Sequence, residues 1–197
     1  MKPTPILAAF GLITALTAGP ALASDTHFKF DGGIGSQPFR TQGGAPVSNV
    51  VASVTPGGAP WVIKSLKADI KTDGGIRLKA EGILLAGGDN IGTRGGPRRM
   101  VASLFCRNAP VGTAPAGTLQ TTPYNSEFVD LDANGDLDIG GSLTNTAGDT
   151  PPADCGNKID NRPVLLLRTV NEPNPNATPP TTSAIAGSWF AAGILKD

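Results

Sequence analysis

The chain has 197 residues, and its 16 Lys+Arg balance its 16 Asp+Glu. This length is typical of one domain or of two small ones. The neutral charge disfavours nucleic acid and anionic membranes as partners. The 26 glycines and 18 prolines disfavour long helices and predict many turns.

The first 23 residues, "MKPTPILAAFGLITALTAGPALA", have the pattern of a secretory signal peptide. Lys2 is the only charge, an apolar run follows from Ile6 to Ala18, and Ala21-Leu22-Ala23 supplies the small-x-small cleavage pattern. The run is too short for a membrane span, although a retained anchor is the alternative. We therefore expect cleavage to leave one secreted or periplasmic domain, residues 24–197. That domain has no membrane span and carries a formal charge of −1, because Lys2 is lost.

The chain has two cysteines, Cys106 and Cys155. In an exported chain an even pair predicts a disulfide, and two free thiols are the alternative. The long enclosed loop predicts about 4 kcal/mol of stabilisation. A catalytic thiol would need a base, and the single histidine, His27, lies near the expected N-terminus. A Cys–His pair is therefore not expected.

Apolar residues recur with a period of two, which predicts strands, and no segment keeps a helical period. The first expected strands are "THFKF" and "VSNVVASV". The clearest element is "SLKADIKTDGGIRLKAE", in which two alternating runs flank "TDG". A three-residue loop would place Gly74 in a left-handed conformation. The resulting register sets two pairs opposite each other, Ile70 with Ile76 and Asp69 with Arg77.

The second half of the chain continues the pattern with "RMVASLFCR", a hairpin in "TPYNSEFVDLDANGDLDIGGSLT", "RPVLLLRTV" and "GSWFAAGIL". The unbroken apolar run of "PVLLL" predicts a central strand, and residues 171–184 read as a Pro-rich loop. About eight or nine short strands with close turns predict an all-β, single-domain antiparallel β-sandwich, Ig-like or jelly-roll-like. The disulfide would tie two of its segments together. Trp61, Trp189 and Tyr124 are expected to pack in its core.

The stretch "DLDANGDLDIGG" has the spacing of a calcium-binding loop. An EF-type loop takes oxygen ligands at positions 1, 3, 5, 7 and 9, glycine at 6 and glutamate at 12. The five oxygen ligands are present as Asp130, Asp132, Asn134, Asp136 and Asp138, and Gly135 supplies the glycine at position 6. Position 12 is Gly141, so the bidentate carboxylate is missing, and the flanking segments do not read as helices.

The same stretch reads as a hairpin with "ANG" as a three-residue loop and Gly135 left-handed. This register puts leucines on one apolar face. It also sets Asp130 opposite Asp138 and Asp132 opposite Asp136, and such like-charged pairs are destabilising. The carboxylates would then either be solvated or bind Ca²⁺ weakly, and both alternatives stay open.

Neither a catalytic triad nor a multi-histidine zinc site is expected from a chain with one histidine. Glu127 and the aspartates contain the carboxylates that a glycosidase pair needs, but nothing in the sequence places them across a cleft. We therefore expect a non-catalytic binding or structural module. The alternatives are a calcium-assisted carbohydrate or cell-surface binding module and a secreted carboxylate-based hydrolase. A glycan or a cell-surface protein is the expected kind of partner.

Several segments resemble small exported bacterial proteins of uncharacterised function. These segments are "FDGGIGSQPF", "PGGAPWVIKSLKADIKTDGGIRLKAEGILLAGGDNIGT", "VASLFC", "LDANGDLDIGGSL", "PVLLLR" and "WFAAGI". The resemblance spans most of the expected mature chain and leaves out residues 171–184. It implies a secreted all-β domain of bacterial origin, and it carries no catalytic residues.

Overall fold

The computed structural model describes residues 25–107, 118–156, 161–174, 176 and 183–196. Residues 1–23, the predicted signal peptide, and half of the predicted Pro-rich loop lie outside these residues. The described residues form strands and no helix, and therefore contain no helix that is long and apolar enough to cross a membrane. The strands are β1 (Thr26–Gly35), β2 (Phe39–Gln42), β3 (Ala45–Ser48), β4 (Trp61–Val62), β5 (Ser65–Lys71), β6 (Gly75–Glu81), β7 (Leu84–Leu85), β8 (Arg99–Phe105), β9 (Tyr124–Asn125), β10 (Val129–Asp130), β11 (Leu137–Ser142), β12 (Val164–Asn171) and β13 (Ile185–Leu195).

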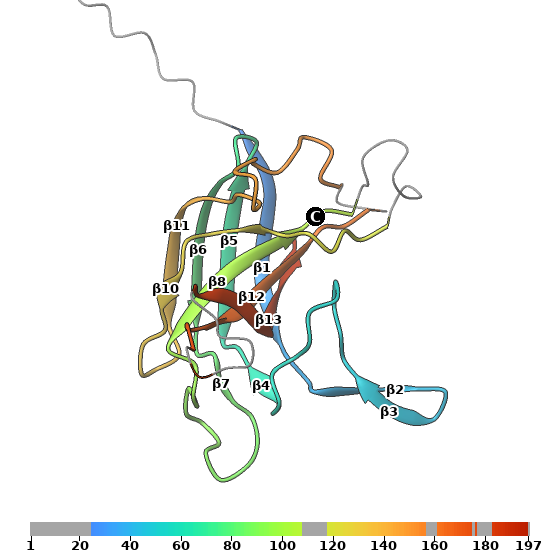
Figure 1. Ribbon diagram of the computed structural model, residues 1–197, viewed down its shortest axis with the longest axis vertical. Coiled ribbons are helices and arrows are strands. Elements are labelled where there is room, and N and C mark those ends of the chain that lie inside the picture. The colour runs from blue at the N-terminus through green and yellow to red at the C-terminus, as the bar shows by residue number, and fades with distance from the viewer. Residues whose placement is uncertain (1–24, 108–117, 157–160, 175, 177–182, 197) are drawn as a thin grey trace, which may run out of the picture.

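Nine of these strands form one antiparallel sheet in the order β10-β8-β12-β13-β1-β5-β6-β11, with β9 also paired to β8. The sheet folds over so that β1, β5, β6 and β11 form one layer, and β8, β12 and β13 cross it as the other (Figure 1). The predicted antiparallel β-sandwich is therefore confirmed, with its two layers joined through the β13–β1 pair. The remaining strands form two short ribbons, β2–β3 and β4–β7.

One hydrophobic core fills the space between the layers. Alternate residues of β5, β6 and β11 point into it, as expected of strands with one buried face. The largest buried side chains of this core include Phe28, Phe30, Leu66, Ile70, Met100, Leu104, Leu143, Leu165 and Leu167. Trp61 and Trp189 are each 4% exposed and Tyr124 packs at the core's margin, so the prediction that they serve packing is confirmed.

The β5–β6 hairpin has the predicted register. Ile70 lies opposite Ile76, and Asp69 lies opposite Arg77. Gly74 has a φ of +84°, and its N–H donates to the carbonyl of Lys71 at 3.0 Å. Local turn chemistry and burial therefore agree, and this hairpin forms the centre of its layer.

Strand β1 is longer than "THFKF" because it runs on through "DGGIG". A register shift between Phe30 and Gly33 marks a bulge, and Gly32 has a φ of +102°. Gly33 lies opposite Gly193 of β13, where a Cβ atom on either residue would come within 2.9 Å of a neighbouring side chain. The glycines therefore permit a close approach of two strands rather than a turn.

The predicted strand "VSNVVASV" is wrong in its second half. Strand β3 ends at Ser48, and the chain then reverses between Val51 and Val54, whose backbones hydrogen-bond to each other. Ala52 and Ser53 both have positive φ, of 49° and 64°. The reversal packs Val54 against the second, smaller apolar cluster, which contains Phe105, Leu166 and Trp189.

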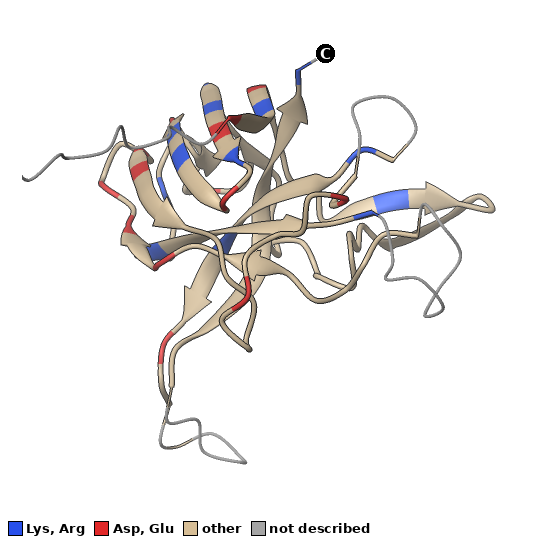
Figure 2. Ribbon diagram, turned by 90° about the horizontal axis from the view of Figure 1, so that it is seen from above, with Lys and Arg blue, Asp and Glu red and all other residues tan. Residues whose placement is uncertain are grey.

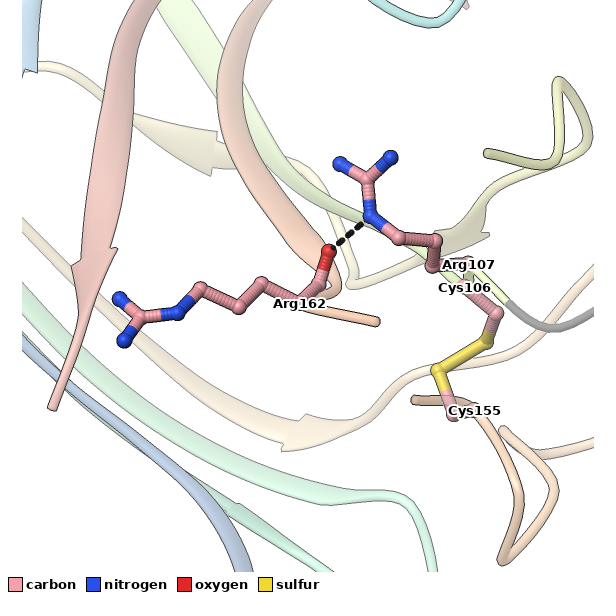
Figure 3. Close-up of a disulfide and its surroundings, with 4 residues drawn as sticks. All are labelled: Cys106, Arg107, Cys155 and Arg162. Atoms are coloured by element: carbon pink, nitrogen blue, oxygen red, sulfur yellow. Dashed lines mark hydrogen bonds between the residues drawn. A yellow bond between two sulfur atoms is a disulfide. The ribbon is translucent and has the colours of Figure 1, made fainter. Parts of the chain in front are cut away.

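Cys106 and Cys155 form the predicted disulfide, with their Cα atoms 4.5 Å apart (Figure 3). The N–H of Arg107 donates to the carbonyl oxygen of Cys155 at 3.0 Å. The Nε of Arg107 donates to the carbonyl oxygen of Arg162 at 2.7 Å. The bridge and these hydrogen bonds tie the end of β8 to the segments that precede β12.

Candidate functional site

The acidic stretch forms the predicted turn at its tip. Gly135 has a φ of +79°, and its N–H donates to the carbonyl oxygen of Asp132 at 3.2 Å. The N–H of Asp132 donates to the carbonyl oxygen of Asp136 at 3.1 Å, so these two residues lie opposite each other. The three-residue loop with a left-handed Gly135 is confirmed.

Beyond the tip the two arms separate, and the predicted pairing of Asp130 with Asp138 is wrong. Asp130 pairs with β8, where it lies opposite Arg99, and Asp138 pairs with β6, where it lies opposite Lys79. Each arm thus joins a different edge of the folded sheet. Opposite charges across strands stabilise a sheet and like charges destabilise it, so this arrangement removes one of the two like-charged pairs.

Two of the carboxylates in this turn are acceptors for backbone N–H groups. The Oδ1 of Asp132 accepts hydrogen bonds from Asn134 at 2.8 Å and from Asp136 at 2.9 Å, and the Oδ1 of Asp136 accepts one from Gly82 at 2.8 Å. Among the residues that the structure describes, no three His, Cys, Asp or Glu side chains are grouped to hold a metal ion. Both alternatives for Asp130, Asp132, Asn134, Asp136 and Asp138, solvated side chains or weak Ca²⁺ binding, stay predictions.

Glu127, the candidate for a glycosidase-like acid, lies beside a shallow hollow of about 400 Å³. The residues that line this hollow are Arg99, Ser126, Glu127 and Phe128. A carboxylate mechanism needs two acids that flank the scissile bond, and the lining contains one. Arg99 is also engaged: it lies 5.4 Å from the ring centroid of Phe128 and bonds to Glu172 at 3.2 Å. The lining therefore supplies one of the two acids, and the carboxylate-based hydrolase stays a prediction.

The outer face of the layer formed by β1, β5, β6 and β11 carries the densest charge. Strand register arranges its side chains in two rows that cross the strands. The first row is Lys29, Asp69, Arg77 and Gly140, and the second is Asp31, Lys67, Lys79 and Asp138. Figure 2 shows bands of both signs side by side on neighbouring strands of this layer. We call this surface the charged face.

Three adjoining hollows cross the charged face. The largest, about 470 Å³, lies over Lys71, Arg77 and the backbone of Gly75, Gly140 and Gly141. A second, about 430 Å³, lies between the two rows on β5, β6 and β11, and a third, about 120 Å³, extends over β1 to Lys196. Asp69 lines all three hollows. They share lining residues, and we call the three together the furrow, which extends from β1 to the edge strand β11.

Most charges on this face have partners, but two cations do not. Lys29 lies 3.7 Å from Asp69, Lys196 lies 3.2 Å from Asp31, and Lys79 lies 3.4 Å from Glu81. Lys67 and Arg77 form no ion pair with any residue in the described part of the chain. Lys67 instead lies opposite Lys79, a like-charged pair that costs stability.

The outer face of the other layer is different because chain segments cover it. Residues 51–54 and Leu119 pack over Phe105, Leu166 and Trp189. The cation there, Arg168, is half-buried, and burial lowers the pKa of its guanidinium. Its Nε and Nη2 donate to the carbonyl oxygens of Gly187 and Ala186, each at 2.8 Å, across an irregular part of the β12–β13 ladder. Arg168 thus supports the fold, and the charged face is the open one.

His27 lies in β1 and is half-buried rather than loose. Its ring stacks on Phe28 with centroids 3.9 Å apart, and its Nδ1 is buried without a hydrogen-bond partner. Burial lowers the pKa of His27, and a hydrogen bond with the backbone of Ala153 acts in the opposite direction. Because Cys106 and Cys155 are oxidised, His27 has no thiol to activate.

Sequence reasoning placed the alternating charges of β5 and β6 on an outer face but did not recognise a site there. The signal was present in Lys67, Arg77 and Lys79, which all point away from the core. The missing information was that β1 and β11 flank the hairpin and extend the rows.

Comparison with known proteins does not identify a function: the sequence matches no protein-family model, no curated protein and no solved structure, so the resemblance to exported bacterial proteins stays a prediction.

Proposed function

We propose that the protein is an exported, non-catalytic binding module whose ligand lies on the charged face. The observation that carries this proposal is the furrow of three adjoining hollows over β1, β5, β6 and β11. It lies on an outer face that the other described segments of the chain leave open. Binding sites are concave and hold a few polar groups that fix the ligand. The furrow has this form, with Asp69 and Arg77 near its centre.

Features elsewhere in the described chain support binding rather than catalysis. The hollow beside Glu127 is lined by one carboxylate, and one oxygen (Oδ1) of each of Asp132 and Asp136 accepts hydrogen bonds from backbone N–H groups. The residues that line the hollows of the charged face include no serine, threonine, cysteine, tyrosine or histidine. Export to the periplasm or the cell exterior, expected from the N-terminal pattern, would expose this face to envelope polymers and surface glycans.

The test compares two variants with the same change in net charge on an array of neutral and acidic glycans. Lys67→Glu/Arg77→Glu reverses both unpaired cations of the charged face. Arg40→Glu/Arg98→Glu reverses two exposed cations elsewhere and is the matched control. We expect the wild-type protein and the control to bind the same glycans, and the face variant to lose at least tenfold in affinity. Equal binding by both variants, or no binding by the wild type, would refute the proposal.

A further inference from the structure

We infer that the ligand of the charged face is a linear acidic glycan, held through its carboxylate or sulfate groups by Lys67 and Arg77. This inference rests on the proposed function and names the ligand class. It starts from the balance of charge. Cations outnumber carboxylates on this face. The cations are Lys29, Lys67, Lys71, Arg77, Lys79 and Lys196, and the carboxylates are Asp31, Asp69, Glu81 and Asp138.

The two unpaired cations lie diagonally across the centre of the furrow. Lys67 is on β5 opposite Lys79, and Arg77 is on β6 opposite Asp69. Diagonal neighbours on adjacent strands are about 7–8 Å apart, so the two side chains reach separate anionic groups. Arg77 has Gly140 as its neighbour on β11, so its guanidinium is open on that side for a bidentate contact with a carboxylate or sulfate.

The lining of the furrow disfavours neutral sugars and apolar peptides. Phe30 is the single aromatic residue that lines it, and its ring is 2% exposed. A neutral glycan would therefore find no aromatic platform on which to stack. A protein partner would find no apolar pocket for an anchoring side chain, which is where interface energy concentrates. Charge-assisted hydrogen bonds remain as the main attraction, and they suit a hydrophilic anionic chain.

The carboxylates at the margins of the furrow restrict how densely the ligand is charged. Asp31 and Asp138 flank Lys67 and Lys79 at the two ends of one row. A polyanion with a charge at every short step would meet these aspartates and be repelled. A glycan offers hydroxyl groups between its acidic groups, and these hydroxyls can donate to the aspartates. The alternation of charge across the face thus matches a polymer in which anionic and hydroxyl groups alternate.

The glycines of β11 leave the furrow open at the edge of the sheet. A Cβ atom on Gly140 or Gly141 would meet no atom within 4 Å. The furrow crosses four strands, about 14 Å at the usual strand spacing, and it ends at this edge without a wall. A linear chain longer than the furrow can therefore continue past β11.

The experiment measures binding of the whole secreted protein by calorimetry to polygalacturonate, the sparsely sulfated galactan κ-carrageenan, neutral dextran and poly-L-glutamate. We expect binding to at least one of the two acidic glycans, weakening in 0.5 M salt because exposed charges are screened. The carboxylated and sulfated probes distinguish the two sources of negative charge. Arg77→Gln should weaken binding about tenfold. Arg40→Gln, also an exposed arginine, should leave it unchanged.

A second variant tests seating in the furrow without changing charge. Gly140→Phe adds a ring over the hollow at a position with an ordinary strand φ and open space, so the fold should tolerate it. We expect at least a tenfold loss of binding to the acidic glycan. Unchanged binding would show that the polymer is attracted without lying in the furrow, which would overturn the inference.

The other outcomes separate this inference from the proposed function. Equal binding of neutral dextran, lost in Lys67→Glu/Arg77→Glu, would overturn the acidic ligand and leave the binding face standing. Equal binding of poly-L-glutamate would identify an acidic peptide instead. If none of these probes binds but another glycan of the array binds through the charged face, the acidic linear glycan is refuted and the proposed function is not. Binding that never depends on the face would overturn both.

Discussion

A methyl group added at Gly135 should be among the most damaging small changes in this protein. Gly135 has a φ of +79°, and an added Cβ would lie 2.5 Å from the carbonyl oxygen of Ile83 and 2.7 Å from its nitrogen. Ile83 is itself buried, and its N–H donates to the carbonyl oxygen of Gly135 at 2.9 Å. Because the clash involves backbone atoms, a side-chain rotation cannot relieve it.

The expected cost of Gly135→Ala has three parts. A left-handed φ costs an alanine about 1–2 kcal/mol, and the reduced freedom of the unfolded chain returns about 0.4–1 kcal/mol of that. Overpacking adds about 1–3 kcal/mol. The strained hydrogen bond between Ile83 and Gly135 adds about 1 kcal/mol. We therefore expect Gly135→Ala to lower the free energy of unfolding by about 3–5 kcal/mol.

Gly92 supplies a matched control because it has the same φ of +79° but nothing within 4 Å of an added Cβ. Gly92→Ala should cost about 1 kcal/mol, from the backbone term alone. Urea unfolding followed by tryptophan fluorescence measures both variants under conditions in which the slope of the transition is unchanged. If the two alanine variants differ by less than about 0.5 kcal/mol, the packing of the acidic turn on Ile83 does not stabilise the fold as argued.

Three further outcomes are expected. Replacing Cys106 and Cys155 with serine should lower the free energy of unfolding by about 4 kcal/mol in chemical denaturation, since the bridge closes a long loop; an unchanged midpoint would contradict this. As the pH falls from 6.5, the unfolded-state pKa of His27, to the lower folded-state pKa, the protein should lose stability, because the folded form binds that proton less tightly. His27→Gln should flatten this part of the profile of melting temperature against pH. A variant profile identical to that of the wild type would refute this expectation. Millimolar calcium should produce no heat in calorimetry and no rise in melting temperature, since Asp132 and Asp136 already accept backbone hydrogen bonds; saturable heat that Asp132→Asn removes would establish the alternative.

Local features of this fold could be predicted because turn chemistry and burial point to the same register. In the β5–β6 hairpin, Gly74 selects the loop and the buried Ile70 and Ile76 select the face. A shift by one residue would turn every apolar side chain to the solvent, so the pattern allows one solution. The turn at Gly135 was predicted for the same reason. The disulfide was predicted from the expectation of export, because two cysteines in an exported chain have few alternatives.

Non-local features were not predictable in this way. The arms that follow Gly135 read as a continuous hairpin, yet each pairs with a different strand, β8 or β6. That choice depends on how the whole sheet folds over its core, which local alternation does not encode. The same applies to "DGGIG" in β1, where Gly33 meets Gly193 from the far end of the chain. A glycine that permits close packing looks the same in sequence as one that permits a turn.

The charged face combines these two kinds of information. Alternation alone places Lys67, Arg77 and Lys79 outside the core, but an outward charge is by itself only a solvated side chain. Two non-local facts make the surface a candidate site: β1 and β11 align further charges with the hairpin, and other chain segments cover the opposite layer instead. The unpaired state of Lys67 and Arg77 then has a physical consequence. These two cations form no ion pair within the described chain, so they are available to a ligand, and removing them should change binding more than stability.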